Sequence, residues 1–421
     1  MRDSYDNDTK PGAVRRALRS FARSGMMTGL LLVLLIAVLS AAYWEHGRGN
    51  LHKLKQKIGN ERPEIPTYRP GGQDPILLTR TRLMGDSAPE FTSMTLLPGR
   101  GMNVLQITAF VPGRGEVNLL TSQTVEDAAK LMTGTGEDAG GAESLKMGAV
   151  FEAPWAGPIS MDTAHTAVWK GRELPSPAGL EKTGGEAGLL LGLASQSAES
   201  SAMPDGGHAQ ATFQLGKDAG PWPWSAQISI TVLLSSKSLD LTMTARNNGD
   251  TPEPVGLGWR PRFAIEGDRS RLRLRLPAQM RVVLGPDGVP TGALAPVAGT
   301  PFDFTPRRGM PLGSMDLNDC FTGLRQDLLE SGPAAEVTSP TGDYGIRITA
   351  LSPTIKALQV IAPANAKSVV VAPRFNFPDP FGHEWSKGAD PGIVVLQPGQ
   401  TVQWRIRVEV FTPTLETGPA S

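Results

Sequence analysis

The main part of the chain alternates apolar and polar residues in short runs that Gly, Pro, Asn or Asp residues separate. Residues 227–234 (QISITVLL), 239–245 (LDLTMTA), 271–276 (RLRLRL) and 401–410 (TVQWRIRVEV) show this period of two. Such a period is typical of strands with one buried face. In RLRLRL it predicts that the three Leu face a core and the three Arg face solvent. The pattern therefore predicts an all-β domain over residues 75–412, most simply two large stacked antiparallel sheets.

One window has a helical pattern instead, residues 124–132 (TVEDAAKLM), and the glycine-rich sequence GTGEDAGG follows it. A phosphate-binding loop of the common kind requires a strand, then glycines, then a helix. The order is reversed here, so the sequence favours a mobile loop over a phosphate site.

The N-terminal part of the chain has a continuous apolar run. Residues 26–44 read MMTGLLLVLLIAVLSAAYW and carry no charge. The run is long enough to cross the hydrocarbon of a bilayer, and its final Tyr and Trp suit the membrane interface. We predict a single transmembrane anchor here. A signal peptide cut after Ala42 is the alternative, because small residues precede that position.

The segments around the anchor give the rest of the predicted organisation. Three Arg and no acid lie in the ten residues before the apolar run, which predicts a cytoplasmic N-terminal tail over residues 1–25. The C-terminal domain is then periplasmic or extracellular, in a single-pass membrane protein. Residues 45–74, polar and interrupted by Pro and Gly, predict a juxtamembrane stalk. Residues 413–421 form a C-terminal tail.

Composition narrows the function classes. The 41 Lys and Arg balance the 41 Asp and Glu, which argues against a dedicated nucleic-acid binder. The 48 Gly and 36 Pro disfavour a helix bundle and agree with turn-rich β-structure. Cys320 is the single cysteine, so an internal disulfide or a multi-cysteine metal site is excluded. We expect Cys320 to be a small buried hydrophobe, and we predict no metal and no cofactor.

Several motifs in order resemble those of the aldose 1-epimerase, or galactose mutarotase, family. They are GAVFEAPWAGPI (148–159), PVGLGWRPRF (254–263), TPFDF (300–304), DLNDCFTG (316–323), VVVAP (369–373) and LQPG (396–399). The resemblance covers about residues 75–411. It implies a β-supersandwich with a sugar-binding site and a known chemistry, mutarotation. In that reaction a base removes the proton of the anomeric hydroxyl while an acid protonates the ring oxygen.

The resemblance breaks at the positions where it places the chemistry. Arg260 stands where the family has its histidine, and Arg262 stands where it has a tyrosine. Asn318 replaces the sugar-binding aspartate, although Asp319 remains beside it, and Ala372 replaces the catalytic glutamate. A guanidinium stays protonated at any working pH, and alanine transfers no proton. The resemblance therefore implies a retained fold without the original proton transfers.

Two further positions of the family pattern are changed. Ala187 and Gly188 stand where the family has His-Gly, and Pro158 stands where it has an arginine. The apolar and Pro/Gly framework persists around all of these changes. This combination is expected when a fold outlives its original chemistry.

Other residues are candidates for the functional site. His383 and Glu384, in PDPFGHEW, are the candidates for a relocated acid and base, but the pair lacks the second histidine of a helical zinc motif. Trp155 is a candidate for stacking on a sugar. Trp222 and Trp224, in GPWPWS, are expected to form the most exposed aromatic cluster.

Three functions remain open from the sequence. The first is a membrane-anchored, mutarotase-like domain that binds a carbohydrate or envelope glycan without catalysis. Arg260 and Arg262 would then favour an acidic group such as a uronate or phosphate, with Asn318, Asp319 and Trp155 completing the site. The second is an active aldose 1-epimerase with relocated acid and base. The third is a structural module whose sheet surface docks another envelope protein.

Overall fold

The computed structural model describes residues 29, 32–40, 43, 68–82, 87–131, 146, 148–159, 167–174, 187–216 and 222–413. The chain divides between residues 66 and 67 into two units, which are described separately. In the first unit, residues 32–40 are helical and their large apolar side chains are exposed. Within the described ranges, no helix combines the length and the apolar character needed to span a membrane.

Most of the segments predicted near the two ends of the chain lie outside the described residues. They are the cytoplasmic tail, most of the anchor and of the stalk, and the C-terminal tail beyond residue 413. Residues 68–74, the last part of the predicted stalk, are described and belong to the second unit. There Pro70 is buried, and the Gln73 side chain exchanges hydrogen bonds with Ser195 at 2.7 Å. The folded unit therefore begins before residue 75.

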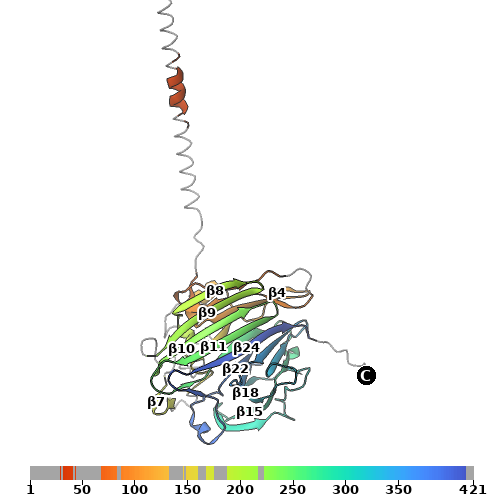
Figure 1. The fold of residues 1–421 in the computed structure, drawn as a ribbon. Helices are drawn as coiled ribbons and strands as arrows, with labels where there is room; N and C mark the ends of the chain where they lie inside the picture. The colour runs from red at the N-terminus through yellow and green to blue at the C-terminus, as the bar shows by residue number, and fades with distance from the viewer. Residues whose placement is uncertain are drawn as a thin grey trace, which may run out of the picture. The chain divides into compact units, whose positions relative to one another are not determined.

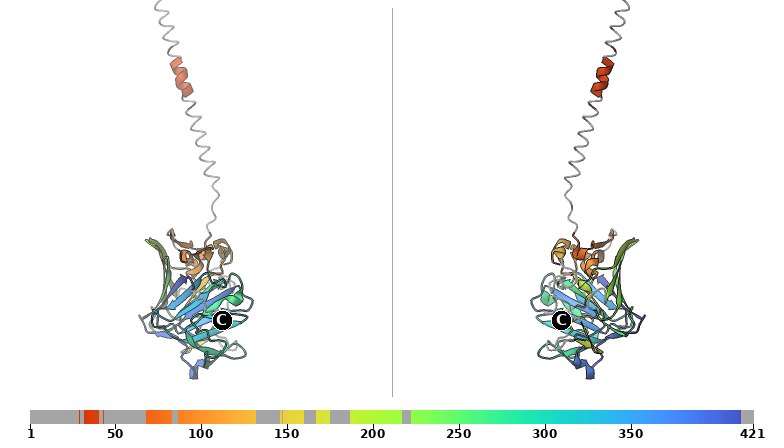
Figure 2. Two further views of the ribbon diagram at one scale, coloured as in Figure 1. Left: turned by 90° about the vertical axis from the view of Figure 1, so that its right-hand side faces the viewer. Right: turned by 90° about the vertical axis from the view of Figure 1, so that its left-hand side faces the viewer.

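The second unit is built from two large sheets whose strand pairs are all antiparallel (Figure 1, Figure 2). In the described chain the larger sheet has eleven strands, in the order β1 (Ile76–Thr79), β2 (Glu90–Leu97), β3 (Asn103–Val111), β5 (Ala149–Glu152), β13 (Gly258–Ala264), β22 (Ser368–Arg374), β21 (Ala357–Ala362), β18 (Leu317–Leu324), β15 (Ala278–Leu284) and β16 (Pro290–Pro296), with β4 (Gly115–Asn118) paired to β3. The other has nine, in the order β17 (Met310–Pro311), β14 (Arg273–Arg275), β19 (Ala334–Thr338), β20 (Gly345–Ala350), β24 (Thr401–Phe411), β11 (Ser238–Asn247), β10 (Ala226–Leu234), β9 (Gly206–Leu215) and β8 (Ser197–Met203).

Short elements complete the unit. They are the two-stranded pairs β6 (Val168–Trp169) with β7 (Arg172–Glu173) and β12 (Glu253–Val255) with β23 (Val394–Leu396), the helix α2 (Val125–Leu131), and the 3₁₀ turns η1 (Pro70–Gly72), η2 (Pro98–Arg100), η5 (Leu190–Gly192), η6 (Arg269–Arg271) and η7 (His383–Lys387). The predicted helix is thus confirmed as α2. Its N-terminus is capped by Thr124, whose Oγ1 accepts a hydrogen bond from the Asp127 backbone N–H at 3.1 Å. The glycine-rich loop after it lies outside the described residues.

One hydrophobic core joins the inner faces of the two sheets. Alternate residues of β10, β11 and β24 are buried in it, as the period of two predicts. In RLRLRL all three leucines are at most 1 % exposed, while the Arg273 guanidinium donates to the backbone oxygens of Arg308 and Gly309. Trp404 of β24 donates through Nε1 to the Pro373 oxygen of β22 at 3.1 Å. The predicted β-sandwich is therefore confirmed.

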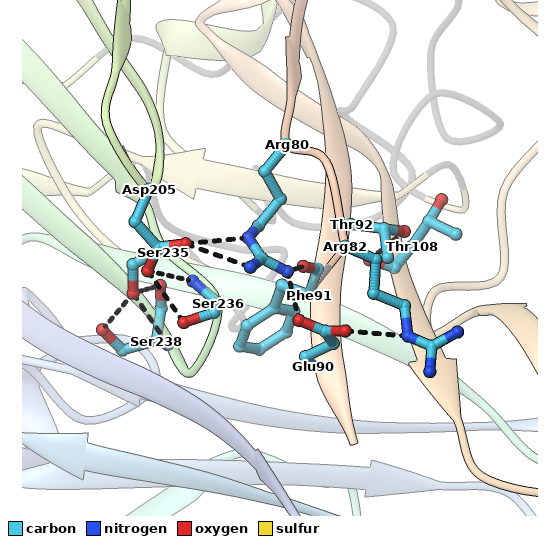
Figure 3. Close-up of polar contacts among 10 residues, drawn as sticks. All are labelled: Arg80, Arg82, Glu90, Phe91, Thr92, Thr108, Asp205, Ser235, Ser236 and Ser238. Atoms are coloured by element: carbon cyan, nitrogen blue, oxygen red, sulfur yellow. Dashed lines mark hydrogen bonds and ion pairs between the residues drawn. The ribbon is translucent and has the colours of Figure 1, made fainter. Parts of the chain in front are cut away.

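A polar cluster joins the sheets at one end (Figure 3). Arg80, which follows β1, pairs with Glu90 at the start of β2 and with Asp205 in the turn between β8 and β9. Asp205 also accepts hydrogen bonds from the Oγ and backbone N of Ser236, at 2.8 and 3.2 Å. The hydrogen bond from the Ser236 hydroxyl lowers the pKa of Asp205 most; burial raises it, but the Ser236 backbone N–H and Arg80 lower it further, so the pKa is lowered overall. The cluster is structural, because Arg80 connects Glu90 of the eleven-stranded sheet with Asp205 of the nine-stranded sheet.

Candidate functional site

The candidate site lies on the face of the eleven-stranded sheet that points away from the core. On β13 the odd-numbered residues Trp259 and Phe263 enter the core, so Arg260 and Arg262 point to the opposite face. The neighbouring strands follow in continuous register. We call the residues of β5, β13, β22, β21 and β18 that point to this side the site face, and describe them in rows of residues that pair across the strands. The first row is Glu152, Gly258, Arg374 and Ala357; the central row is Val150, Arg260, Ala372, Gln359 and Cys320; the third row is Arg262, Val370, Ile361 and Asn318.

The central row brings together the positions that the sequence singled out. Gly258 pairs with Arg374 and Arg262 pairs with Val370, so Arg260 lies level with Ala372 in the next strand. Facing residues of adjacent antiparallel strands have Cα atoms about 4.5–5.5 Å apart. The Arg260 side chain is 7 % exposed and Ala372 is fully buried. A guanidinium and a methyl group thus stand side by side in the centre of the site face.

Arg262 lies one row away on the same face. It is half-buried, and its Nη1 approaches the Ser368 Oγ at 3.4 Å. Two guanidinium groups therefore project from one strand to one side. Arginine pairs well with the paired oxygens of carboxylate and phosphate groups.

Gln359 is a site residue that the sequence reasoning missed. It pairs with Ala372 on one side and with Cys320 on the other, and its Nε2 donates to the Asn318 Oδ1 at 2.9 Å. This bond fixes the amide, whose Oε1 is buried without a hydrogen-bond partner in the described part of the chain. The side chain is 5 % exposed. The signal that could have identified it is its position as a polar residue in the middle of the apolar strand ALQVIA.

The first hypothesis requires Asp319 to lie in one site with Arg260, but the structure places the two residues on different faces of the sheet. Consecutive strand residues point to opposite faces, so Asn318 lies on the site face and Asp319 on the other side of β18. There it pairs with Arg281, whose Nη1 lies 3.1 Å from Oδ1 and whose guanidinium covers the Phe302 ring. Burial raises the pKa of Asp319, and Arg281 offsets part of the rise. Asp319 therefore acts in packing, away from the site face.

A buried ion pair forms the adjacent row. Arg374 donates through Nε and Nη2 to the two carboxylate oxygens of Glu152, each at 2.8 Å. Both residues are at most 1 % exposed. Gly258, between them in β13, leaves room, because a Cβ there would lie 2.8 Å from both side chains. Within the site face Glu152 is the one carboxylate, and both its oxygens are engaged.

Two apolar clusters flank the central row. On the β5 side, Ala128 of α2 packs with Val150, Leu105, Ala187 and Leu191, which places the Ala187 of the sequence motif under α2. On the β18 side, Cys320 and Ala357 pack with Val282, Phe377 and Trp385 of η7. Cys320 is 1 % exposed, as predicted, and burial raises its pKa to about 12.

His383 and Glu384 begin η7, the turn that carries Trp385 onto the site face. The indole Nε1 of Trp385 donates to the Asp379 oxygen at 2.9 Å, which fixes the turn. The His383 side chain is 82 % exposed, whereas that of Glu384 is 8 % exposed, and Nδ1 lies 3.8 Å from Oε2. The pair is therefore held beside the site face at its β18 side, with the imidazole open to solvent.

The tryptophans are placed differently from what the sequence suggested. Trp155 is fully buried and packs against Trp222, with ring centroids 5.8 Å apart. Its ring therefore offers no surface for stacking on a ligand. Trp222 and Trp224 are 2 % and 5 % exposed, so the prediction that they form an exposed cluster is wrong. The sequence GPWPWS has the composition of a loop, but both rings belong to the main hydrophobic core.

Glu253 is a buried acid outside the site face. It lies on β12 and is fully buried. Burial raises its pKa to about 8, and the Trp222 indole offsets only part of the rise. Among the described residues, no group of three or more His, Cys, Asp or Glu could hold a metal ion.

Comparison with known proteins agrees with the fold. The model of the aldose 1-epimerase family matches residues 199–409. A putative aldose 1-epimerase from Escherichia coli K12 superposes with a TM-score of 0.57 at 17 % identity, over 79 % of this chain and 99 % of that chain. For a galactose mutarotase-like protein from Clostridium acetobutylicum the TM-score is 0.62 at 14 % identity, over 79 % and 98 %. For the galactose 1-epimerase from Lactobacillus acidophilus it is 0.55 at 15 %, over 81 % and 99 %.

At these identities the structures establish a shared fold. No curated protein matches the chain.

Proposed function

Because the chain belongs to the aldose 1-epimerase family, we propose that its β-sandwich domain binds a carbohydrate that carries an acidic group and does not interconvert anomers. The observation that carries this proposal is the central row of the site face. Arg260 and Ala372 lie level in adjacent strands, at the positions where the family resemblance places an acid and a base.

The lack of catalysis follows from the chemistry of these two side chains. Mutarotation needs one group that takes a proton and another that gives one. Arg260 keeps its proton at any working pH, and Ala372 has none to exchange. Glu152, the one carboxylate of the site face, is fully buried and bound at both oxygens by Arg374. No member of the site face is thus placed as a free base.

The preference for an acidic ligand follows from the charge of the site face. Arg260 and Arg262 supply two guanidinium groups to one side of β13, and such groups bind carboxylate or phosphate oxygens with charge-assisted hydrogen bonds. Gln359 adds a buried acceptor, its Oε1, which suits a sugar hydroxyl. Uronates and sugar phosphates combine both features.

The proposal includes a membrane anchor over residues 26–44. Its support is the uncharged apolar run and the exposed apolar side chains of the helical residues 32–40. An anchor with a cytoplasmic N-terminus would hold the domain outside the cytoplasm, where envelope glycans with acidic groups would be the ligands. Retention of the full-length chain in membranes washed at high pH is expected, and its release would contradict the anchor.

An active epimerase with relocated groups is the second candidate, and one observation favours it. The turn η7 places Trp385 in one apolar cluster with Cys320 of the site face, and Cys320 pairs with Gln359 of the central row. His383 and Glu384 are therefore held beside the site face. An imidazole and a carboxylate are the groups that the reaction requires.

Polarimetry of fresh α-glucose and α-galactose separates the two candidates. With the full-length chain we expect decay at the spontaneous rate. An acceleration that His383→Ala abolishes would establish the second candidate and refute the first.

Calorimetric titration tests the ligand class. We expect glucuronate and glucose 6-phosphate to bind more tightly than glucose, and Arg260→Ala to weaken their binding about tenfold or more. The matched control is Arg271→Ala, which removes an exposed guanidinium from η6 and should leave the affinity unchanged. Equal affinity for charged and neutral sugars would refute the role of the arginines. A folded chain that binds no sugar would leave the third hypothesis, a module that docks another envelope protein.

A further inference from the structure

The strand β8 forms one edge of the nine-stranded sheet and is exposed on both of its faces. All seven residues, Ser197–Met203, are exposed, and the strand pairs on one side only, with β9 (Figure 1). An edge strand presents unpaired backbone groups and is a template for another strand. Folded proteins usually prevent such pairing with prolines, charges, irregular register or a short strand.

In the described chain, the other edges of the two large sheets carry such protection. The strand β17 has two residues, one of them Pro311. The strand β16 begins with Pro290 and ends with Pro296, its register with β15 is irregular, and η7 packs on it. The strands β1 and β4 have four residues each. In contrast, β8 contains no Pro, Lys or Arg, and its register with β9 is continuous.

The hairpin geometry shows which backbone groups of β8 are available. A two-residue turn joins Met203 to its partner Gly206, and the pair that closes such a turn is hydrogen-bonded within the hairpin. Because hydrogen-bonded and non-hydrogen-bonded pairs alternate along an antiparallel ladder, the N–H and C=O groups of Ala198, Ser200 and Ala202 point away from β9. These three residues can pair with a further strand.

We propose that β8 pairs antiparallel with β8 of a second copy of this chain, centred on Ser200. In this register Ser200 faces its own copy and Ala198 faces Ala202, so every available residue meets another available residue. Glu199, the single charge of the strand, faces Ser201 of the partner. The side chains are small and the arrangement has two-fold symmetry, which is the commonest symmetry of homodimers. The nine-stranded sheets of the two copies then form one continuous sheet.

The expected dimer is reversible. Stable interfaces bury about 1,200–2,000 Å² in total, and one pair of short strands contributes only part of that area. Met203 at the end of β8 is 47 % exposed, and covering this side chain adds apolar area to the contact. Association should therefore depend on protein concentration.

Cysteine cross-linking tests the register directly. Facing residues in an antiparallel ladder lie within the Cα separation that a disulfide allows. We expect Ser200→Cys in the full-length chain, in detergent and under mild oxidation, to form a covalent dimer. The matched control is Ser314→Cys, which is exposed and lies outside the strands. The native Cys320 is buried and should not react. Equal cross-linking of the two variants, or none in either, would overturn the proposal.

Sedimentation velocity in density-matched detergent provides the second test. The dimer fraction of the unmodified chain should rise with concentration, and Ser200→Pro, which removes an outward N–H, should weaken association about tenfold or more. Ser200→Lys, which places a charge on the edge, should act in the same way and serves if the proline variant misfolds. A monomer at every concentration, or a dimer that both variants retain, would refute pairing through β8.

Discussion

The buried ion pair between Arg374 and Glu152 allows a quantitative test of the packing in the site face. Both side chains are at most 2 % exposed, and two hydrogen bonds of 2.8 Å join them. Arg374→Met would leave the Glu152 carboxylate buried without its partner. Removal of one member of a buried pair typically lowers the free energy of unfolding by about 3–5 kcal/mol. We expect a loss in this range.

The double variant separates the charge effect from packing. A buried pair replaced by apolar residues of similar volume is often neutral or stabilising, so Glu152→Met with Arg374→Met should recover most of the loss. The surroundings restrict the choice of side chain, because Gly157 and Gly258 lie directly against Arg374. An unbranched Met adapts to such a space better than a branched residue.

Urea unfolding followed by tryptophan fluorescence measures all of these variants. The chain has eight Trp, and Trp404 among them is hydrogen-bonded to the backbone at Pro373, next to Arg374, so the combined signal includes this region. The exposed pair Arg69 and Asp74, joined at 2.6 Å, provides the control, and Asp74→Asn should change stability little. If Arg374→Met lowers the free energy of unfolding by less than about 1 kcal/mol, or if the double variant is no better than the single one, the pair is not desolvated as described.

Three further predictions concern pH and catalysis. The pKa of Glu253 is raised by burial from 4.5 to about 8, so between these pH values the folded state holds a proton that the unfolded state has lost. The contribution of this group to stability should be greatest below about pH 4.5 and fall as pH rises to 8, by up to roughly 1.4 kcal/mol per unit. Thermal unfolding across this range should show the slope in the unmodified chain and not in Glu253→Gln. Burial raises the pKa of Asp343, but hydrogen bonds from Ser339 and Thr341 outweigh burial and lower the pKa to about 2. The ionised carboxylate therefore stabilises the folded state above pH 3.8, and this stabilisation is lost as the pH falls toward 2. Asp343→Asn should reduce the pH dependence of stability in that acid range. Arg260→His combined with Ala372→Glu should accelerate mutarotation above the spontaneous rate in polarimetry, and a folded double variant without acceleration would show that more than these two groups has been lost.

The sequence was sufficient to predict the β-sandwich because its period of two extends over long strands. In β24 the buried residues Trp404, Ile406 and Val408 alternate with polar ones, and no other regular structure buries such a pattern on one side. The short helix α2 was equally predictable, since its capping residue and acidic first turn are local signals.

The arrangement of the site was less predictable, for physical reasons. Asn318 and Asp319 were grouped as neighbours in sequence, although adjacent strand residues diverge to opposite faces. Trp155 and Trp222 lie outside regular strands, and their local sequence gives no sign of burial. They are buried through contacts with residues that are distant in sequence. Gln359 becomes a site residue through its pairing with Ala372, and strand order is a tertiary property. The period of a strand therefore predicts which of its side chains are buried, whereas the order of the strands in the sheet determines which side chains lie next to one another.

The same alternation explains how this family fold can be retained while its chemistry changes. On β13 the side chains that hold the sandwich together, Trp259 and Phe263, lie on the core face, and Arg260 and Arg262 lie on the other. A substitution at an even-numbered position of this strand leaves the core contacts intact. The side chain at position 260, although only 7 % exposed, lies on the site face outside the core between the sheets, whereas a charge at position 259 would be buried in that core. The residues that differ from the family pattern and the residues that hold the core therefore lie on opposite faces of one strand.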